Sequence, residues 1–165
     1  MRRLSGHGEH PRYQEMKRPR FISVLLLTLA ISVGGIATAP SALAYTPTGT
    51  EGMMFKMTNA SRAHYGRAPL RLNWSLSYLA HKHSAAMAAK GTIFHTSNLG
   101  SALSSYSWTI AGENVGVSPN LTLLEQAFMA SPAHRANILN SRYKTAGVGA
   151  VWHNGVVYVT VEFLG

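Results

Sequence analysis

Beyond residue 47, apolar positions recur first at the spacing of helices and, near the end of the chain, at the spacing of strands. The first helix is indicated by residues that repeat every three or four positions: Met53, Met57, Ala60 and His64. A capping box from Thr48 to Glu51 predicts where this helix begins, and Gly66 predicts where it ends. A second helix is expected between Asn73, a good N-cap, and Gly91.

Two shorter helices are expected after an irregular region. Residues 92–112 show little periodicity and many Ser, Thr and Gly, so we expect a loop that surrounds a site. Thr122 and Glu125 form a second capping box, in which Glu125 would cap a third helix. A fourth helix is predicted to begin at Ser131-Pro132, with Ser131 as the cap and proline in the first turn.

Strands follow these helices, which makes the fold class α+β. We expect strands at 146–151 and 155–163, joined by a hairpin turn at Asn154-Gly155, with a further candidate strand at 112–117. In the last strand four apolar residues alternate with Tyr158, Thr160 and Glu162. This alternation predicts one face in the core and one polar face, on which Glu162 would be exposed, with a position at the cleft as the alternative.

The N-terminal segment has the composition of a secretory signal peptide. Residues 1–20 carry a net +4, residues 21–33 are almost entirely apolar, and Ala42-Leu-Ala44 matches the small-residue cleavage pattern. We therefore predict a signal peptide at 1–44, a linker at 45–50 and one domain at 51–165. Met16 is an alternative translation start, and an uncleaved anchor is the alternative to cleavage.

Composition narrows the classes of protein to which the chain can belong. The 165 residues contain no Cys, which excludes a disulfide framework, a thiolate zinc site and a cysteine nucleophile. The formal charge is +9, of which nine Lys and Arg against four Glu leave +5 on residues 45–165. Because this charge is spread without runs, nucleic-acid binding is poorly supported. We expect a secreted, extracytoplasmic bacterial protein, monomeric and without a transmembrane anchor after cleavage.

Three residues are candidates for chemistry: His95, Glu113 and His134. Two imidazoles and one carboxylate suit a divalent metal such as zinc, and they suit general acid–base chemistry equally well. No zinc-protease, serine-hydrolase or phosphate-loop motif accompanies them. Their spacing alone therefore leaves metal binding, catalysis and a purely structural role open.

A series of motifs between Met54 and Phe163 resembles the CAP superfamily, the cysteine-rich secretory, antigen 5 and pathogenesis-related proteins with a sperm-coating-protein-like (SCP) domain. The resemblance is closest to the Cys-free bacterial branch. It depends on the order and spacing of these motifs: Asn59-x-x-Arg62, Gly66-x-x-Pro69-Leu70-x-x-Asn73, Leu76-x-x-x-Ala80-x-x-His83-Ser84, Phe94-His95, Gly112-Glu113-Asn114-Val115, Ser131-Pro132-x-His134-Arg135-x-Asn137-Ile138-Leu139 and Gly147-Val148-Gly149.

The resemblance implies a three-layer α–β–α sandwich with a central cleft lined by two His and two Glu. By motif, three of these match His95, Glu113 and His134. The second Glu belongs to a Trp-x-x-Glu pattern, in which this chain has Phe128 and Ser131. We therefore expect Glu113 to be the lone carboxylate of the cleft, which weakens both metal binding and paired-carboxylate chemistry.

Several neighbouring residues have structural interpretations beside functional ones. His83 is expected to be a hydrogen-bonded packing residue, and His64 and His81 to be solvated or at the edge of a helix face. Asn114 would bond to backbone and shape the loop that holds Glu113. Ser131, a helix cap, is a poor nucleophile candidate. Arg135 is expected to pair with a carboxylate, and the Met residues of the first helix are expected in the core.

Two functions remain, and enzymatic activity is the less favoured. The resemblance implies a binding or interaction module for lipids or other cell-envelope components, with a site made by His95, Glu113, His134, Ser131 and Asn114. The alternative is a hydrolase or peptidase with Glu113 as base and with His95 and His134 holding a metal or polarising a carbonyl. Both versions of the site predict that His95 and His134 lie close together.

Overall fold

The computed structural model describes residues 48–165, so the predicted signal peptide, its cleavage site and Met16 lie outside the described residues. The helices are α1 (Gly49–His64), α2 (Trp74–Lys90), α3 (Leu99–Ala102), α4 (Leu121–Ala130) and α5 (Pro132–Leu139). The strands are β1 (Arg71–Leu72), β2 (Ala111–Ser118), β3 (Thr145–His153) and β4 (Val156–Leu164). Within this part of the chain, no helix is long and apolar enough to cross a membrane.

The strands form one sheet in the order β1-β3-β4-β2. β4 pairs antiparallel with both β3 and β2, and the short β1 pairs parallel with β3. The β3–β4 hairpin turns at Asn154 and Gly155, whose φ angles are 49° and 78°. Both values lie in the left-handed region that a two-residue hairpin turn requires, so the predicted Asn-Gly turn is confirmed.

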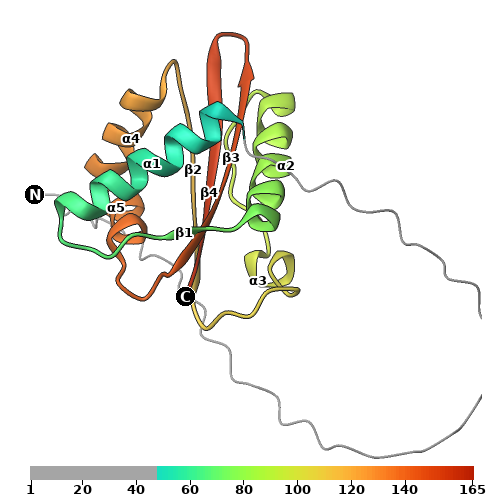
Figure 1. Ribbon diagram of the computed structural model, residues 1–165. Helices are drawn as coiled ribbons and strands as arrows, with labels where there is room; N and C mark the ends of the chain where they lie inside the picture. The colour runs from blue at the N-terminus through green and yellow to red at the C-terminus, as the bar shows by residue number, and fades with distance from the viewer. Residues whose placement is uncertain (1–47) are drawn as a thin grey trace, which may run out of the picture.

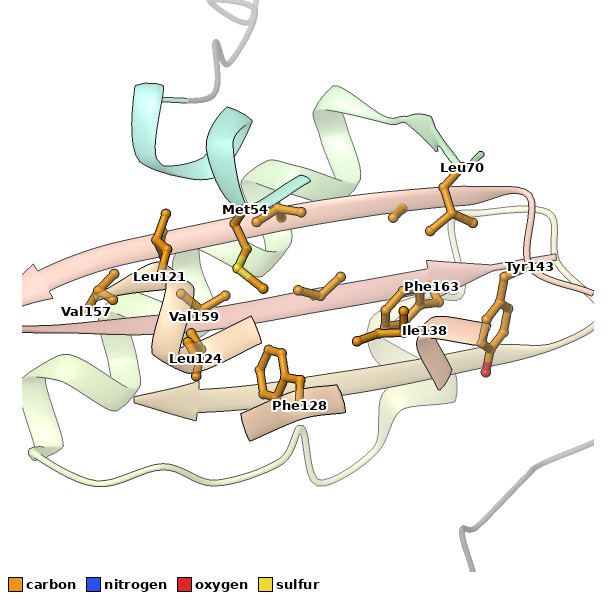
Figure 2. Packing of buried hydrophobic residues seen from close by; sticks show 14 of the residues in the cluster. Met54, Leu70, Leu121, Leu124, Phe128, Ile138, Tyr143, Val157, Val159 and Phe163 are labelled. Carbon is orange, nitrogen blue, oxygen red and sulfur yellow. The ribbon is translucent and has the colours of Figure 1, made fainter. Parts of the chain in front are cut away.

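The sheet lies between two layers of helices, which confirms the predicted α–β–α sandwich. α2 covers one face, and α1, α4 and α5 cover the other (Figure 1). The main core lies on the three-helix side, where valines of β4 and Phe163 meet Met54, Leu124 and Phe128 (Figure 2). On the other face, the backbones of β3 and α2 lie close together. A Cβ at Gly147 or Gly149 of β3 would collide with the backbone of α2.

This arrangement buries both faces of β4 and overturns one prediction. Tyr158, Thr160 and Glu162 lie on the face that α2 covers, and Glu162 is only 1% exposed. Alternation of polar residues indicates a solvated face only where no helix packs on it. The expected exposure of Glu162 was therefore wrong.

The predicted capping box of the third helix is also wrong. α4 is capped by Asn120, whose side chain accepts from the backbone N–H of Leu123. Glu125 is buried, and its carboxylate accepts hydrogen bonds from the hydroxyls of Ser61, at 2.6 Å, and Thr58, at 3.4 Å. Glu125 therefore joins α4 to α1. Burial raises the pKa of Glu125, and the two hydroxyl donors oppose this rise.

The start of α1 and both ends of α2 confirm the predicted signals. Thr48 and Glu51 make the reciprocal capping box of α1, so this helix already includes the last two residues of the predicted linker. Asn73 caps α2, and Gly91 ends it in the left-handed conformation. The sequence did not indicate β1 or α3, which are two and four residues long.

Two motif residues of α1 hold irregular chain in place. The guanidinium of Arg62 is buried and donates to the carbonyls of Ala68, Ile138 and Asn140 at 2.6–3.0 Å. Asn59 bonds both the N–H and the carbonyl of Leu70. Of the first two methionines of α1, Met54 is buried as expected, whereas Met53 is 58% exposed.

Gly149→Ala tests the close approach of α2 to the sheet. The new Cβ would meet the backbone of Ala80 and His81, and we expect it to lower the free energy of unfolding by about 2–3 kcal/mol. Gly52→Ala is the matched control, because nothing lies within 4 Å of its Cβ and alanine favours the α1 helix, adding about 0.5–1 kcal/mol. Urea denaturation measures both; equal effects would contradict the packing described here.

Candidate functional site

Glu113 is the centre of the candidate site and lies on β2, the edge strand of the sheet. Its residue is 8% exposed. The preceding Gly112 allows close packing, because a Cβ there would collide with the hydroxyl of Tyr143. The Gly-Glu-Asn motif therefore holds the carboxylate on a strand, where the sequence suggested a loop or a strand.

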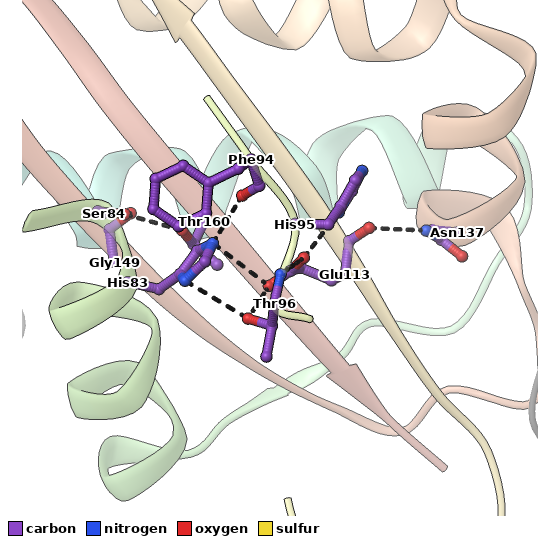
Figure 3. Close-up of polar contacts among 9 residues, drawn as sticks. All are labelled: His83, Ser84, Phe94, His95, Thr96, Glu113, Asn137, Gly149 and Thr160. Carbon is purple, nitrogen blue, oxygen red and sulfur yellow. Dashed lines mark hydrogen bonds and ion pairs between the residues drawn. The ribbon is translucent and has the colours of Figure 1, made fainter. Parts of the chain in front are cut away.

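The segment after α2 surrounds the Glu113 carboxylate with donors (Figure 3). Nδ1 of His95 lies 2.7 Å from Oε1 of Glu113, and the imidazole donates because a carboxylate only accepts. The backbone N–H of Thr96 donates to the same oxygen at 3.0 Å, and its hydroxyl donates to Oε2 at 2.7 Å. Thr96 was not a predicted site residue, although it directly follows His95 in the sequence.

These contacts favour the charged forms of both Glu113 and His95. Burial raises the pKa of Glu113, but the hydrogen bonds from His95 and Thr96 outweigh it and leave the pKa below its ordinary value. The hydrogen bond to Glu113 raises the pKa of His95, against the opposing effect of burial, and the charge of Glu113 adds to the rise. Each group of the pair therefore shifts the pKa of the other toward its charged form, with Glu113 buried and His95 exposed.

His83 supports this segment from α2. Its Nε2 lies 2.8 Å from the carbonyl oxygen of Phe94 and 3.8 Å from Oε2 of Glu113 (Figure 3). The expectation of a hydrogen-bonded packing residue is met, and the bond ties α2 to the segment that carries His95. Proximity to Glu113 adds a second imidazole beside the carboxylate, which the helical periodicity alone did not indicate.

α5 approaches β2 from the other face of the sheet. The side chain of Asn114 donates to the backbone carbonyl of His134 at 3.1 Å and accepts from Asn137 at 2.9 Å. Asn137 also donates to the backbone carbonyl of Glu113 at 3.2 Å. Asn114 and Asn137 thus fasten α5 to the strand that carries Glu113.

His134 is half-buried, with its ring centroid 4.9 Å from that of Phe128. Burial lowers the pKa of His134, and the positive charge of His95 lowers it further. The charge of His95 therefore acts on His134, and the pKa values of the two histidines shift in opposite directions.

Glu162 brings a second carboxyl group to the site. It lies directly opposite Glu113 in the β2–β4 register, is 1% exposed, and its Oε2 has no hydrogen-bond partner. Burial raises the pKa of Glu162 well above its ordinary value, and the charge of Glu113 and a hydrogen bond with it add to the rise. The expectation that Glu113 is the lone carboxylate is therefore wrong.

Ser131 precedes α5 as expected, but its hydroxyl makes no capping hydrogen bond. The guanidinium of Arg135 lies 4.7 Å from the ring centroid of Tyr65, so it stacks on an aromatic ring where a carboxylate was expected. His64 is exposed, whereas His81 is half-buried and bonds the buried Glu51 at 2.8 Å, so the expectation of a solvated His81 was incomplete.

The donors present do not make a three-residue zinc site. Among residues 48–165, no three His, Cys, Asp or Glu side chains are placed to hold one metal ion. Catalytic zinc usually takes three protein ligands, and Nδ1 of His95 is already bonded to Glu113. Zinc on His95 and His134 alone remains a prediction.

A cavity of about 280 Å³ lies away from these residues. Its lining contains two cations and several hydroxyl groups: Arg71, Asn73, Tyr106, Ser107, Lys144, Thr145, Leu164 and Gly165. We place the candidate site at Glu113, because hydrogen-bonded titratable groups converge there and none of them lines this cavity.

The opposite pKa shifts of His95 and His134 can be tested by titration. We expect the pKa of His95 to lie above 6.5 and that of His134 below it, as followed by NMR of the imidazole protons. Glu113→Gln should lower the pKa of His95 by removing its anionic partner, and should raise that of His134. Glu125→Gln, a buried carboxylate elsewhere, should change neither; unchanged histidines in Glu113→Gln would contradict the ion pair.

Burial of Glu162 predicts a pH-dependent stability. Because its folded-state pKa is raised, Glu162 stabilises the fold below the unfolded pKa of about 4.5, and this contribution is lost as pH rises through the folded pKa. Glu162→Gln should therefore lose less stability than the wild type between pH 5 and pH 8 in urea denaturation. Parallel pH curves for the two proteins would show that Glu162 does not take up a proton on folding.

Comparison with known proteins agrees with this fold and its motifs. The sequence profile of CAP, the cysteine-rich secretory protein family, matches residues 55–163. The uncharacterized protein YkwD of Bacillus subtilis (strain 168) is 33% identical over 122 residues, which are 70% of this chain and 47% of that protein. The chain thus spans about half the length of this relative.

Solved structures share the fold at lower identity. An extracellular protein with an SCP domain from Bacillus anthracis superposes with a TM-score of 0.63 at 24% identity, covering 70% of this chain and 40% of that one. An outer surface protein of Borrelia burgdorferi superposes with a TM-score of 0.61 at 17% identity, covering 68% of this chain and 90% of that one. With the family profile matched over most of the described residues and a Cys-free sequence like that of the bacterial branch, the chain belongs to the CAP family.

Proposed function

We propose that this is a secreted bacterial CAP protein whose site around Glu113, His95 and His134 binds a lipid or another cell-envelope component without turning it over. The observation that carries the proposal is the saturated Glu113 carboxylate, which accepts three hydrogen bonds from His95 and Thr96. Secretion is supported by the predicted signal peptide and by the extracellular and outer-surface proteins that share the fold.

A carboxylate in this state favours recognition over catalysis. An efficient general base has a pKa near the working pH and a lone pair directed at the substrate. The pKa of Glu113 is lowered, and its oxygens are occupied by donors. Glu113 is therefore better suited to hold His95 in one orientation and in its charged form.

His95 and His134 are then the groups that would meet a ligand. The side chain of His95 is 62% exposed, and its second ring nitrogen points away from Glu113 (Figure 3). A charged imidazole donates strongly to an acceptor such as the phosphate oxygen of a lipid headgroup. The half-buried His134 adds a ring that can donate or accept beside the apolar Phe128.

One observation favours the alternative, a hydrolase that uses Glu113. Glu113 and Glu162 form a carboxyl pair whose pKa values are shifted in opposite directions, which is a pattern of acid–base sites. In this version Glu162 would store a proton behind Glu113, and His95 and His134 would polarise a carbonyl or hold a metal. The burial of Glu162 argues for a supporting role and against contact with substrate.

A single NMR experiment separates the two functions. The probe is dihexanoyl-phosphatidylglycerol below its micelle concentration, with binding followed at the imidazole protons and hydrolysis followed by phosphorus NMR in the same tube. We expect saturable shifts at His95 and His134, no product, and binding weakened about tenfold in Glu113→Gln, because this variant removes the carboxylate that favours the charged, donating form of His95. Glu125→Gln is the matched control and should bind like the wild type.

Each other outcome has a clear consequence. Product that disappears in Glu113→Gln would establish the hydrolase, whereas saturation without shifts at either histidine would remove the site from ligand binding. Repeating the titration with zinc chloride tests the candidate metal site. Ligation by both rings should shift both resonances, and His134→Ala should abolish the effect on His95.

A further inference from the structure

Every carboxylate side chain in residues 48–165 is buried. These are Glu51, Glu113, Glu125 and Glu162, with 0%, 8%, 6% and 1% exposure, and the sequence contains no Asp. Arg62 is also buried, but the other Lys and Arg side chains of this part are all exposed: Lys56, Arg67, Arg71, Lys82, Lys90, Arg135, Arg142 and Lys144. The formal net charge of +5 therefore understates the positive charge on the surface. In the described region, every exposed charged side chain is a Lys or Arg.

The outer face of α2 combines this charge with exposed aromatic rings. Trp74 and Tyr78 are 53% and 51% exposed, and Lys82 follows one turn later with its Nζ 5.8 Å from the Tyr78 ring centroid. Residues four apart on a helix lie on the same face. The opposite face of α2 is buried against β3 and β4, and α2 is the helix that forms this layer of the sandwich (Figure 1).

A second group of a cation and apolar side chains lies at the C-terminal end of the helix. Lys90 lies in the last turn, with its Nζ 4.6 Å from the Phe94 ring centroid, and Ile93 is 45% exposed just beyond it. α2 itself contains two lysines and no acidic residue. The exposed side of α2 therefore carries aromatic groups and cations, with no carboxylate side chain exposed among the described residues to repel an anion.

We propose that the exposed side of α2 around Trp74, Tyr78 and Lys82 docks the protein on the surface of an anionic phospholipid bilayer. Trp and Tyr favour the interface between headgroups and acyl chains, because their rings are apolar and their polar atoms can stay hydrated. Lysine stems lie along the apolar boundary while their ammonium groups reach lipid phosphates. The alternation of both kinds of side chain on one helix face matches these two requirements together.

The aromatic rings distinguish a bilayer from a soluble polyanion. A polyphosphate or a nucleic acid backbone needs only the cations, which are spread over the whole described surface. The exposed Trp74 and Tyr78 have a use at a membrane interface that charge alone does not give them. The inference extends the proposed function by naming a membrane surface, and it rests on that proposal only for a location outside the cytoplasm.

Vesicle co-sedimentation tests the docking face. The full chain is expressed with its own N-terminal segment and purified from the compartment to which the host exports it. We expect binding to vesicles of equal parts phosphatidylglycerol and phosphatidylcholine, little binding to phosphatidylcholine alone, and a loss of affinity between 50 and 500 mM NaCl. The double variant W74S/K82S should bind the anionic vesicles at least fivefold more weakly, the loss expected from one lysine alone.

The matched control is W152S/K56S, on the other side of the sheet. Trp152 is 51% exposed and bonds Thr50 of α1, and Lys56 is exposed on α1, so this variant loses the same two side-chain types. It should bind vesicles like the wild type, and circular dichroism should show both variants folded. Equal losses in both variants, equal binding to neutral vesicles, or binding of polyphosphate without vesicle binding would each overturn the inference.

A third variant keeps this inference separate from the proposed function. Glu113→Gln weakens the candidate site while leaving the outer face of α2 unchanged, so it should still sediment with the anionic vesicles. Loss of vesicle binding in Glu113→Gln alone would assign the membrane contact to the candidate site and overturn the docking face. Conversely, W74S/K82S should retain the histidine shifts caused by the short-chain lipid.

Discussion

Glu51, Glu113 and Glu125 each accept hydrogen bonds from segments distant in the sequence, and the order of the layers depends on these contacts. The Glu51 carboxylate of α1 accepts hydrogen bonds from the imidazole of His81 on α2 and from the backbone N–H of Ala150 on β3. One buried carboxylate therefore joins all three layers. Glu125 joins α4 to α1. In a chain without Cys, these charge-assisted bonds supply long-range connections that disulfides supply in other small secreted domains.

The same use of carboxylates shapes both proposed functions. Glu113 fastens the segment after α2 to the edge strand, and in doing so it gives His95 a raised pKa and a fixed orientation. Because all the acidic side chains of the described region are inside, the charged side chains exposed on that region are all Lys and Arg. Burying the anions therefore organises the site and at the same time leaves a cationic exterior.

Features that depend on neighbours in the chain were predicted well. The capping box at Thr48, the N-cap Asn73 and the Asn154-Gly155 turn are each formed by groups within a few residues, so residue type is sufficient evidence for them. Features that depend on packing were not. Glu125 and Glu162 had plausible local roles, but partners 64 or more residues away for Glu125 and the covering helix for Glu162 decided where each lies.

The candidate site shows the same division. Its motifs identified His95, Glu113, His134 and Asn114 as residues of one site, and composition identified Glu as its only available acid. Only the tertiary structure revealed three further residues of this site. The register of β2 with β4 places Glu162 opposite Glu113, and the path of the chain after α2 brings Thr96 and His83 to the Glu113 carboxylate. Such pairs bring together groups far apart in sequence, and burial then sets their protonation, because the cost of an ion depends on the atoms that surround it.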